Sequence, residues 1–265
     1  MKNKFQLIII VISLLSFPKV NFGQTVTLGA AEKFALFTKA GAIGDNAVGH
    51  SLVTGDIGYE NSGAYTGFGN VNGVVHPGVD AATTACGLAV DNIVTQLNGM
   101  PATLFPANLI GNGATFVPGI YSITGVTTMN ADLILDGQSN STSLFVIKIQ
   151  GINGNLNINA NAKLKLINGA LACNVFWQVD KAVSMASGVS MKGNIVAGGA
   201  IGMATLDTLD GRLLATVGAI STDGDLIYTP VGCGSPLLTG PKAPDLASIA
   251  CYAVFSSNGN LLNTA

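Results

Sequence analysis

Short apolar runs separated by glycine-rich or polar corners recur along the chain from about residue 115 onward. The runs expected to form one face of successive coils are Leu144–Ile149, Val175–Val179, Asn194–Ala197 and Arg212–Thr216. The residues expected to point inward from two other faces are Ile158, Leu164, Leu166, Met185, Met191, Met203, Leu209, Ile220 and Leu226. Three faces per turn predict a coil of triangular cross-section, with rungs about 4.8 Å apart.

A block of an apolar residue, a charged residue and glycine recurs within these runs. Its copies are Leu135-Asp136-Gly137, Met191-Lys192-Gly193 and Leu209-Asp210-Gly211. The last two are one turn of roughly 18 to 20 residues apart, a spacing typical of a solenoid whose turns stack. Stacked turns present regular, extended faces, so the pattern favours a protein that binds through a surface.

One segment has a different periodicity and predicts a helix. Between residues 79 and 97 apolar side chains recur at three- and four-residue steps, namely at Val79, Ala82, Cys86, Ala89, Ile93 and Leu97. Asn98-Gly99 ends the pattern, and Pro101 follows. A lone amphipathic helix in a β protein must pack its stripe against the solenoid. We therefore expect a single domain over 24–265, with a cap-like region and the helix at about 60–100.

Composition and the N-terminus narrow the class of protein. Charged residues make up 10% of the chain and the net charge is −2, so the basic stripe that nucleic-acid binding needs is absent. Met1–Lys4 is cationic and Leu7–Leu15 is apolar, which predicts a signal peptide over 1–23. An uncleaved anchor is the alternative. We expect an extracellular protein with no membrane span after cleavage, or a cell-surface protein if the natural chain continues past residue 265.

Export permits disulfides among Cys86, Cys173, Cys233 and Cys251. Four cysteines allow three pairings, and sequence alone does not choose among them. We favour Cys233 with Cys251, because they lie one solenoid turn apart. The chain has no Cys-x-x-Cys pair and only two histidines, so neither a metal nor another cofactor is expected.

Four runs resemble the ice-binding proteins of cold-living bacteria, fungi and microalgae: Thr66–Gly73, Asn174–Val179, Gly211–Leu214 and Leu238–Pro241. The resemblance covers nearly all of residues 28–260. It implies a right-handed, three-faced β-solenoid with an α-helix packed along its side. It also implies that the N-terminal rung stacks next to the C-terminal one. That order would explain why Tyr252–Gly259 is similar to Phe34–Gly41; a longer array of domains is the other explanation.

In this family one flat face binds ice through rows of hydroxyl and small residues. The matching positions here are Thr124, Thr127, Asn130, Asn159, Asn161, Ser187, Ser190, Thr205, Thr208 and Thr222. Small side chains lose little rotamer entropy when ordered, and hydroxyls can anchor water in an array. Charges such as Lys192 and Asp223 should bound the rows. We expect a secreted, monomeric antifreeze protein that adsorbs to the ice surface and inhibits ice growth and recrystallisation.

An enzyme is the first competing class. Asp207 with Asp210, and Asp223 with Asp225, are the close acidic pairs. Two residues three apart on a strand point to opposite faces, and Asp-Gly-Asp is typical of a turn. No recognised nucleophile or phosphate-binding motif occurs. We therefore expect no catalysis.

The second competitor is an adhesin or carbohydrate-binding module without ice activity. Sugar sites need exposed aromatic rings. Trp177 lies in an apolar strand, where core packing is expected, and the candidate stacking residues are Tyr59, Tyr65 and Tyr121.

Overall fold

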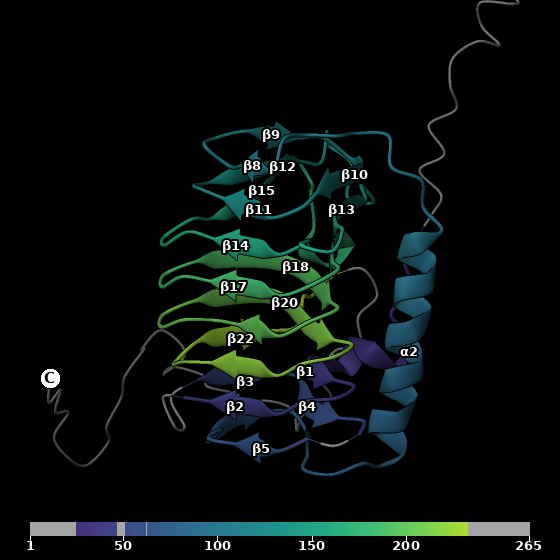
Figure 1. Ribbon diagram of the computed structural model, residues 1–265, viewed down its shortest axis with the longest axis vertical. Coiled ribbons are helices and arrows are strands. Elements are labelled where there is room, and N and C mark those ends of the chain that lie inside the picture. The colour runs from purple at the N-terminus through teal and green to yellow at the C-terminus, as the bar shows by residue number, and fades with distance from the viewer. Residues whose placement is uncertain (1–24, 47–50, 62, 233–265) are drawn as a thin grey trace, which may run out of the picture. The chain divides into compact units, whose positions relative to one another are not determined.

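The computed structural model describes residues 25–46, 51–61 and 63–232. This part is mainly β, with parallel strands and one long helix, and belongs to the compact unit Met1–Ser235 (Figure 1). Two short 3₁₀ turns occur, η1 (Gly29–Lys33) and η2 (Ala172–Asn174). The expected signal peptide and the repeat at Tyr252–Gly259 lie outside the described residues.

The first face belongs to the largest sheet, whose main path follows successive coils. In spatial order its strands are β10 (Gly119–Thr124), β13 (Phe145–Gln150), β16 (Val175–Val179), β18 (Ser190–Ala197), β20 (Thr208–Ala215), β1 (Phe34–Thr38), β4 (Asp56–Tyr59) and β7 (Val75–His76). The four runs expected to share one face do so, which confirms that expectation.

The second face is an eight-stranded parallel sheet. Its strands, in spatial order, are β5 (Tyr65–Thr66), β2 (Ile43–Asp45), β21 (Ile220–Thr222), β19 (Ile201–Gly202), β17 (Val183–Met185), β14 (Leu156–Ile158), β11 (Thr127–Met129) and β8 (Leu109–Ile110).

The third face begins with the sheet of β15 (Leu164–Ile167), β12 (Leu133–Asp136) and β9 (Thr115–Phe116). A bridge between Lys163 and Ser190 joins it to the first halves of β18 and β20. It continues through β22 (Leu226–Tyr228), β3 (Leu52–Thr54) and β6 (Asn70–Asn72). The strands β18 and β20 pass from this face to the first at Gly193 and Gly211. A Cβ on Gly211 would collide with the Gly193 carbonyl of the neighbouring coil, so only glycine fits there.

The N-terminal rungs stack on the C-terminal coil. Strand β1 lies between β20 and β4, with Leu36 paired to Leu213. Helix α2 (Ala81–Asn98) then runs along the stack, and the chain begins its continuous coils at the opposite end (Figure 1). The discontinuous order that the resemblance implies is therefore confirmed.

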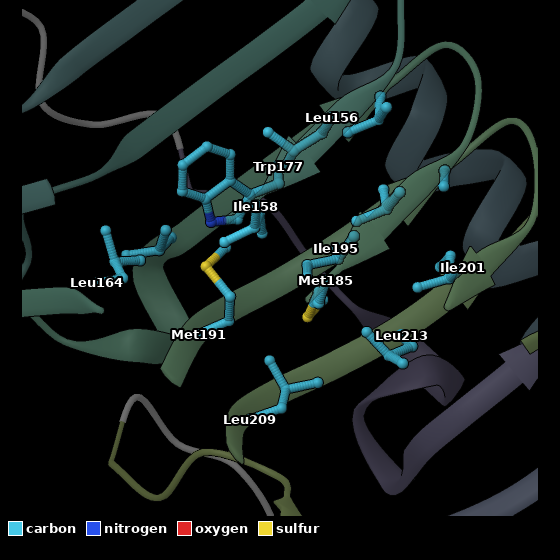
Figure 2. Packing of buried hydrophobic residues seen from close by; sticks show 14 of the residues in the cluster. Leu156, Ile158, Leu164, Trp177, Met185, Met191, Ile195, Ile201, Leu209 and Leu213 are labelled. Carbon is cyan, nitrogen blue, oxygen red and sulfur yellow. The ribbon is translucent and has the colours of Figure 1, made fainter. Parts of the chain in front are cut away.

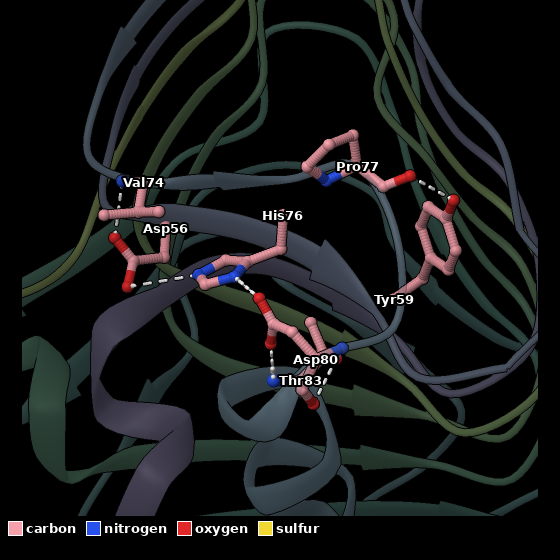
Figure 3. A network of polar contacts seen from close by, with 7 residues as sticks. All are labelled: Asp56, Tyr59, Val74, His76, Pro77, Asp80 and Thr83. Atoms are coloured by element: carbon pink, nitrogen blue, oxygen red, sulfur yellow. Dashed lines mark hydrogen bonds and ion pairs between the residues drawn. The ribbon is translucent and has the colours of Figure 1, made fainter.

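The helix lies over the first face, as expected. Its N-terminus is a capping box, in which the Asp80 carboxylate accepts a hydrogen bond from Thr83 N at 2.8 Å and Thr83 Oγ1 accepts one from Asp80 N at 2.9 Å. His76 of β7 contacts the same carboxylate at 2.5 Å, which joins the last strand to the helix (Figure 3). The buried stripe of the helix packs against outward residues of the sheet: Phe34, Phe37, Val146, Phe176, Val196 and Leu214.

The interior of the stack is apolar. Trp177, Ile158 and Met191 point into it together (Figure 2), and Trp177 is fully buried, with its Nε1 donating to the Lys192 carbonyl at 3.2 Å. The expected inward residues are buried, apart from Leu166, which is partly buried, and Leu226. The expectation for Leu226 is wrong. Leu209 pairs with Ile227, so Ile227 enters the core and Leu226 is 43% exposed.

Cysteine chemistry differs from the sequence-based expectation. Cys173 is disulfide-bonded and Cys86 is a buried free thiol. Cys233 and Cys251 lie outside the described residues and are the two remaining cysteines. A cysteine forms one disulfide, so a bond from Cys173 to either of them is incompatible with the Cys233–Cys251 pair that we favoured.

Candidate functional site: an uncharged face of small residues

The outward side of the eight-stranded sheet is an array of small side chains, which we name the small-residue face. Alternate residues of each strand point inward and outward, and the outward positions of successive strands are in register. From β8 to β5 they form the central column: Leu109, Thr128, Asn157, Ser184, Gly202, Ser221, Gly44 and Thr66.

A second column runs beside the first, two residues upstream on each coil. The backbone carbonyls of its residues accept hydrogen bonds from the neighbouring strands, which places them in register as well. This alanine column consists of Asn155, Ala182, Ala200, Ala219, Ala42 and Ala64. Five of the six side chains are single methyl groups with no rotamers to lose.

Neither column contains a charged side chain. Asp45 is on the same sheet but points inward and is 4% exposed. Lys181 and Asp223 lie at the two margins, just outside the strands β17 and β21. The small-residue face is therefore a regular array of methyl, hydroxyl and amide groups, repeated at about 4.8 Å along the stack.

The other two faces are unlike it. Helix α2 covers the first. The third face carries ion pairs between Lys165 and Asp132 at 2.7 Å and between Lys192 and Asp210 at 3.8 Å. Within the described part of the chain, only the small-residue face is both uncovered and uncharged.

Half of the site residues expected from sequence meet at one corner, where the chain leaves the small-residue face for the third face. The amides of Asn130 and Asn159 are hydrogen-bonded at 2.7 Å, and the hydroxyls of Ser187 and Thr205 at 3.0 Å. Asn161 is exposed in the same corner. These five residues line the margin of the small-residue face and not its centre.

The other five are dispersed. Thr127 and Thr222 are fully buried, so neither can touch a solid surface. Ser190 and Thr208 are on the third face, with their hydroxyls 2.9 Å apart. Thr124 is exposed at the end of β10. The rows expected from sequence thus pass around the stack instead of lying on one face.

Sequence reasoning missed the central column. Its signal is a small residue flanked by two large inward ones, as in Val183-Ser184-Met185 and Ile201-Gly202-Met203. Hydroxyl content alone does not reveal which side of a strand a residue occupies, because a shift of one residue moves it to the opposite face.

Features of the competing function classes are internal. The carboxylates of Asp207 and Asp225 are buried and accept backbone N–H groups, and the described residues contain no acidic, histidine or cysteine cluster suited to a metal ion. Tyr59 and Tyr121 are buried, and half-buried Tyr65 stacks on Phe68. None of the helices in this part of the chain is long and apolar enough to cross a bilayer.

Comparison with known proteins agrees with this geometry. A family model described as "Ice-binding-like" matches residues 38–228. An ice-binding protein of Flavobacterium frigoris (strain PS1) is 33% identical over 217 residues, which cover 73% of this chain and 74% of that protein. An ice-binding protein of Nostoc sp. (strain HG1) is 29% identical over 231 residues, covering 83% and 81%.

Solved structures are similar over the same region. The crystal structure of an ice-binding protein from an Antarctic bacterium of the Flavobacteriaceae has a TM-score of 0.77 and 44% identity, and covers 89% of this chain. The present chain spans 54% of that one, about half its length. A second, from an Antarctic biological consortium, has a TM-score of 0.71 and 30% identity, covering 78% and 91%. The match over 38–228 includes strands of all three faces and the whole of α2, and this chain belongs to the ice-binding family.

Proposed function

We propose that this protein is a secreted, non-enzymatic ice-binding protein that adsorbs to ice through the small-residue face. The observation that carries the proposal is the in-register central column, in which uncharged, mostly small side chains repeat once per rung. The relatives named ice-binding proteins support the choice of ligand. We further propose that the three sheets close a right-handed coil of triangular cross-section and that the protein acts as a monomer.

The physical argument rests on rigidity and repetition. Strand backbones held on both sides by parallel neighbours keep each outward group in place, so little entropy is lost when the face meets a solid. Hydroxyls and amides can hold water in an ordered array, and methyl groups lie between them. Adsorbed protein makes further growth of the curved ice front between neighbouring molecules unfavourable, which inhibits both growth and recrystallisation.

The test uses the same substitution on two faces. Ser184→Tyr places a bulky ring in the central column, whereas Ser190→Tyr places it on the third face, six residues further along. Thermal hysteresis and recrystallisation inhibition are measured on mature protein whose fold is checked by circular dichroism. We expect Ser184→Tyr to lose most of the activity and Ser190→Tyr to retain it. The reverse result would move the ice-binding surface to the third face.

The wild-type protein tests the function itself. Faceted ice crystals and inhibited recrystallisation are expected. A folded protein with neither effect would overturn the proposal, and binding on a glycan array would then favour a carbohydrate-binding module. Secretion is tested separately: the culture medium should contain a chain that begins at about Gln24.

A further inference from the structure

Three buried aspartates lie beneath the margin of the small-residue face, at the corner where the chain turns toward the third face. The exposed fractions of Asp45, Asp207 and Asp225 are 4%, 1% and 2%. In the preceding coils the position equivalent to Asp207 and Asp225 is occupied by Val189 and Ala162. The lining of this corner therefore changes from apolar to acidic where the C-terminal coil meets the N-terminal rungs.

Each of the first two carboxylates clamps two successive turns. Asp207 Oδ1 accepts a hydrogen bond from Val189 N at 2.8 Å, and its Oδ2 accepts one from Ala204 N at 3.0 Å. Asp225 repeats the arrangement one coil later, with its oxygens accepting from Asp207 N and Asp223 N, both at 2.9 Å. One oxygen thus binds the residue's own turn and the other binds the turn of the neighbouring coil.

Asp45 extends the clamp to the N-terminal rungs. Its Oδ2 accepts from Ser51 N at 3.0 Å, and its Oδ1 accepts from the Ser51 hydroxyl at 2.8 Å. The same hydroxyl oxygen accepts from Asp225 N at 3.0 Å. The network therefore joins segments that are far apart in sequence, at the junction where the N-terminal strands continue the small-residue face.

The clamped turns carry the margin of that face. Ala204 and Thr205 are in the turn held by Asp207, and Ser187 is in the turn that ends at Val189. An ionised carboxylate accepts hydrogen bonds with both oxygens, whereas a protonated one presents an O–H donor in place of one acceptor. Protonation of Asp207 must therefore release one of its two backbone N–H groups.

No cation offsets these carboxylates. Within the described residues, no lysine, arginine or histidine forms an ion pair with any of the three. The charged groups that face Asp207 are Asp225 and, beyond it, Asp223 and Asp45, while the turns at 186–189 and 204–206 contribute no titratable side chain. Burial, with a contribution from the Asp225 charge, raises the pKa of Asp207 to about 7, and burial also raises the pKa of Asp225.

We propose that Asp207, Asp225 and Asp45 are positioning residues that hold the margin of the small-residue face at one-rung spacing, and that the ionised ladder is the form that binds ice. This inference rests on the proposed function. Ice activity accordingly decreases as the pH is lowered through the range in which Asp207 takes up a proton.

The experiment is a pH profile of thermal hysteresis, from about pH 5 to about pH 9, with circular dichroism at each pH to show that the protein is folded. Wild type, Asp207→Asn and the control Asp210→Asn are compared. Asp210 lies three residues along the same strand, on the third face, and outside the ladder. We expect wild type and Asp210→Asn to lose hysteresis below about pH 7, and Asp207→Asn to lack that step. A purely structural role would move the melting temperature but not the profile.

The outcomes separate the two proposals. Hysteresis of folded wild type that does not change with pH overturns the ladder inference and leaves the small-residue face intact, and so does an Asp207→Asn profile equal to that of wild type. Absence of ice activity in wild type at every pH overturns the proposed function instead. If Asp207→Asn does not fold, the wild-type profile still decides, because it needs no variant.

Discussion

The hydroxyl of Thr222 lies 3.3 Å from the carboxylate of Asp45, although 177 residues separate the two in sequence. Both side chains are buried, in strands that are neighbours in the eight-stranded sheet. This contact is part of the junction at which β2 and β5 continue the small-residue face beyond the C-terminal coil. The breadth of the face thus depends on a long-range contact inside the stack.

Removal of that hydroxyl should weaken the junction. Thr222→Val leaves the Asp45 and Ser51 groups with one hydrogen-bond partner fewer in a buried site, which costs about 1–3 kcal/mol of the free energy of unfolding. Chemical denaturation measures the loss. Thr208→Val is the matched control, because Thr208 is half-buried on the third face, and its effect should stay within about 0.5 kcal/mol. Equal losses in both variants would contradict the role of Thr222.

Gly211 should not tolerate a side chain. A Cβ there would meet the Gly193 carbonyl of the neighbouring coil, so Gly211→Ala must displace the backbone, at a cost of about 1–3 kcal/mol. Gly78→Ala is the control: a Cβ at Gly78 meets nothing within 4 Å. Melting temperatures of the two variants check the prediction, and an unchanged Gly211→Ala would show that the corner is looser than the structure indicates.

Stability should depend on pH through Asp207. Its pKa in the folded protein, about 7, is above the ordinary value of 3.8, so the folded state binds the proton more tightly than the unfolded state. The stabilisation is therefore greatest below about pH 4 and is lost as the pH rises through 7, at up to about 1.4 kcal/mol per pH unit. Denaturation at several pH values should show this slope in wild type and a smaller slope in Asp207→Asn. An identical slope would assign the titration to another group.

The corner row and the central column should differ in their effect on ice activity. Ser187→Tyr and Thr205→Tyr alter the margin of the small-residue face, where each ring can extend over the corner toward the third face. We expect each to reduce thermal hysteresis less than Ser184→Tyr does. If the two corner variants abolish activity while Ser184→Tyr does not, the binding surface is centred on the corner.

Thiol chemistry provides an independent check on the cysteines. Cys86 is buried against the sheet, and burial raises the pKa of its thiol, so an alkylating reagent should label it only after unfolding. Peptide mapping without reduction should find Cys173 in a disulfide. Recovery of an unpaired Cys173 peptide, with Cys233 joined to Cys251, would restore the pairing favoured from sequence.

The periodic patterns of this chain were sufficient to predict the class of fold. Apolar steps of three and four residues predicted the helix at 79–97, observed at Ala81–Asn98, because helix periodicity is a local property. Apolar runs at solenoid spacing predicted the stacked coils, and an apolar strand predicted the burial of Trp177. Each of these follows from residues close together in sequence.

The location of the site followed from tertiary structure instead. A strand shows one side to solvent and the other to the core, and a one-residue shift exchanges them; for this reason Thr127 and Thr222 are interior while Ser184 and Ser221 are exposed. The pairing of Leu209 with Ile227 likewise placed Leu226 outside. The aspartate ladder joins Asp45 to Ser51 and Thr222, residues that meet only after the N-terminal rungs stack on the C-terminal coil. The sequence determined which segments are strands and which is a helix, and long-range register decided which side chains share a surface.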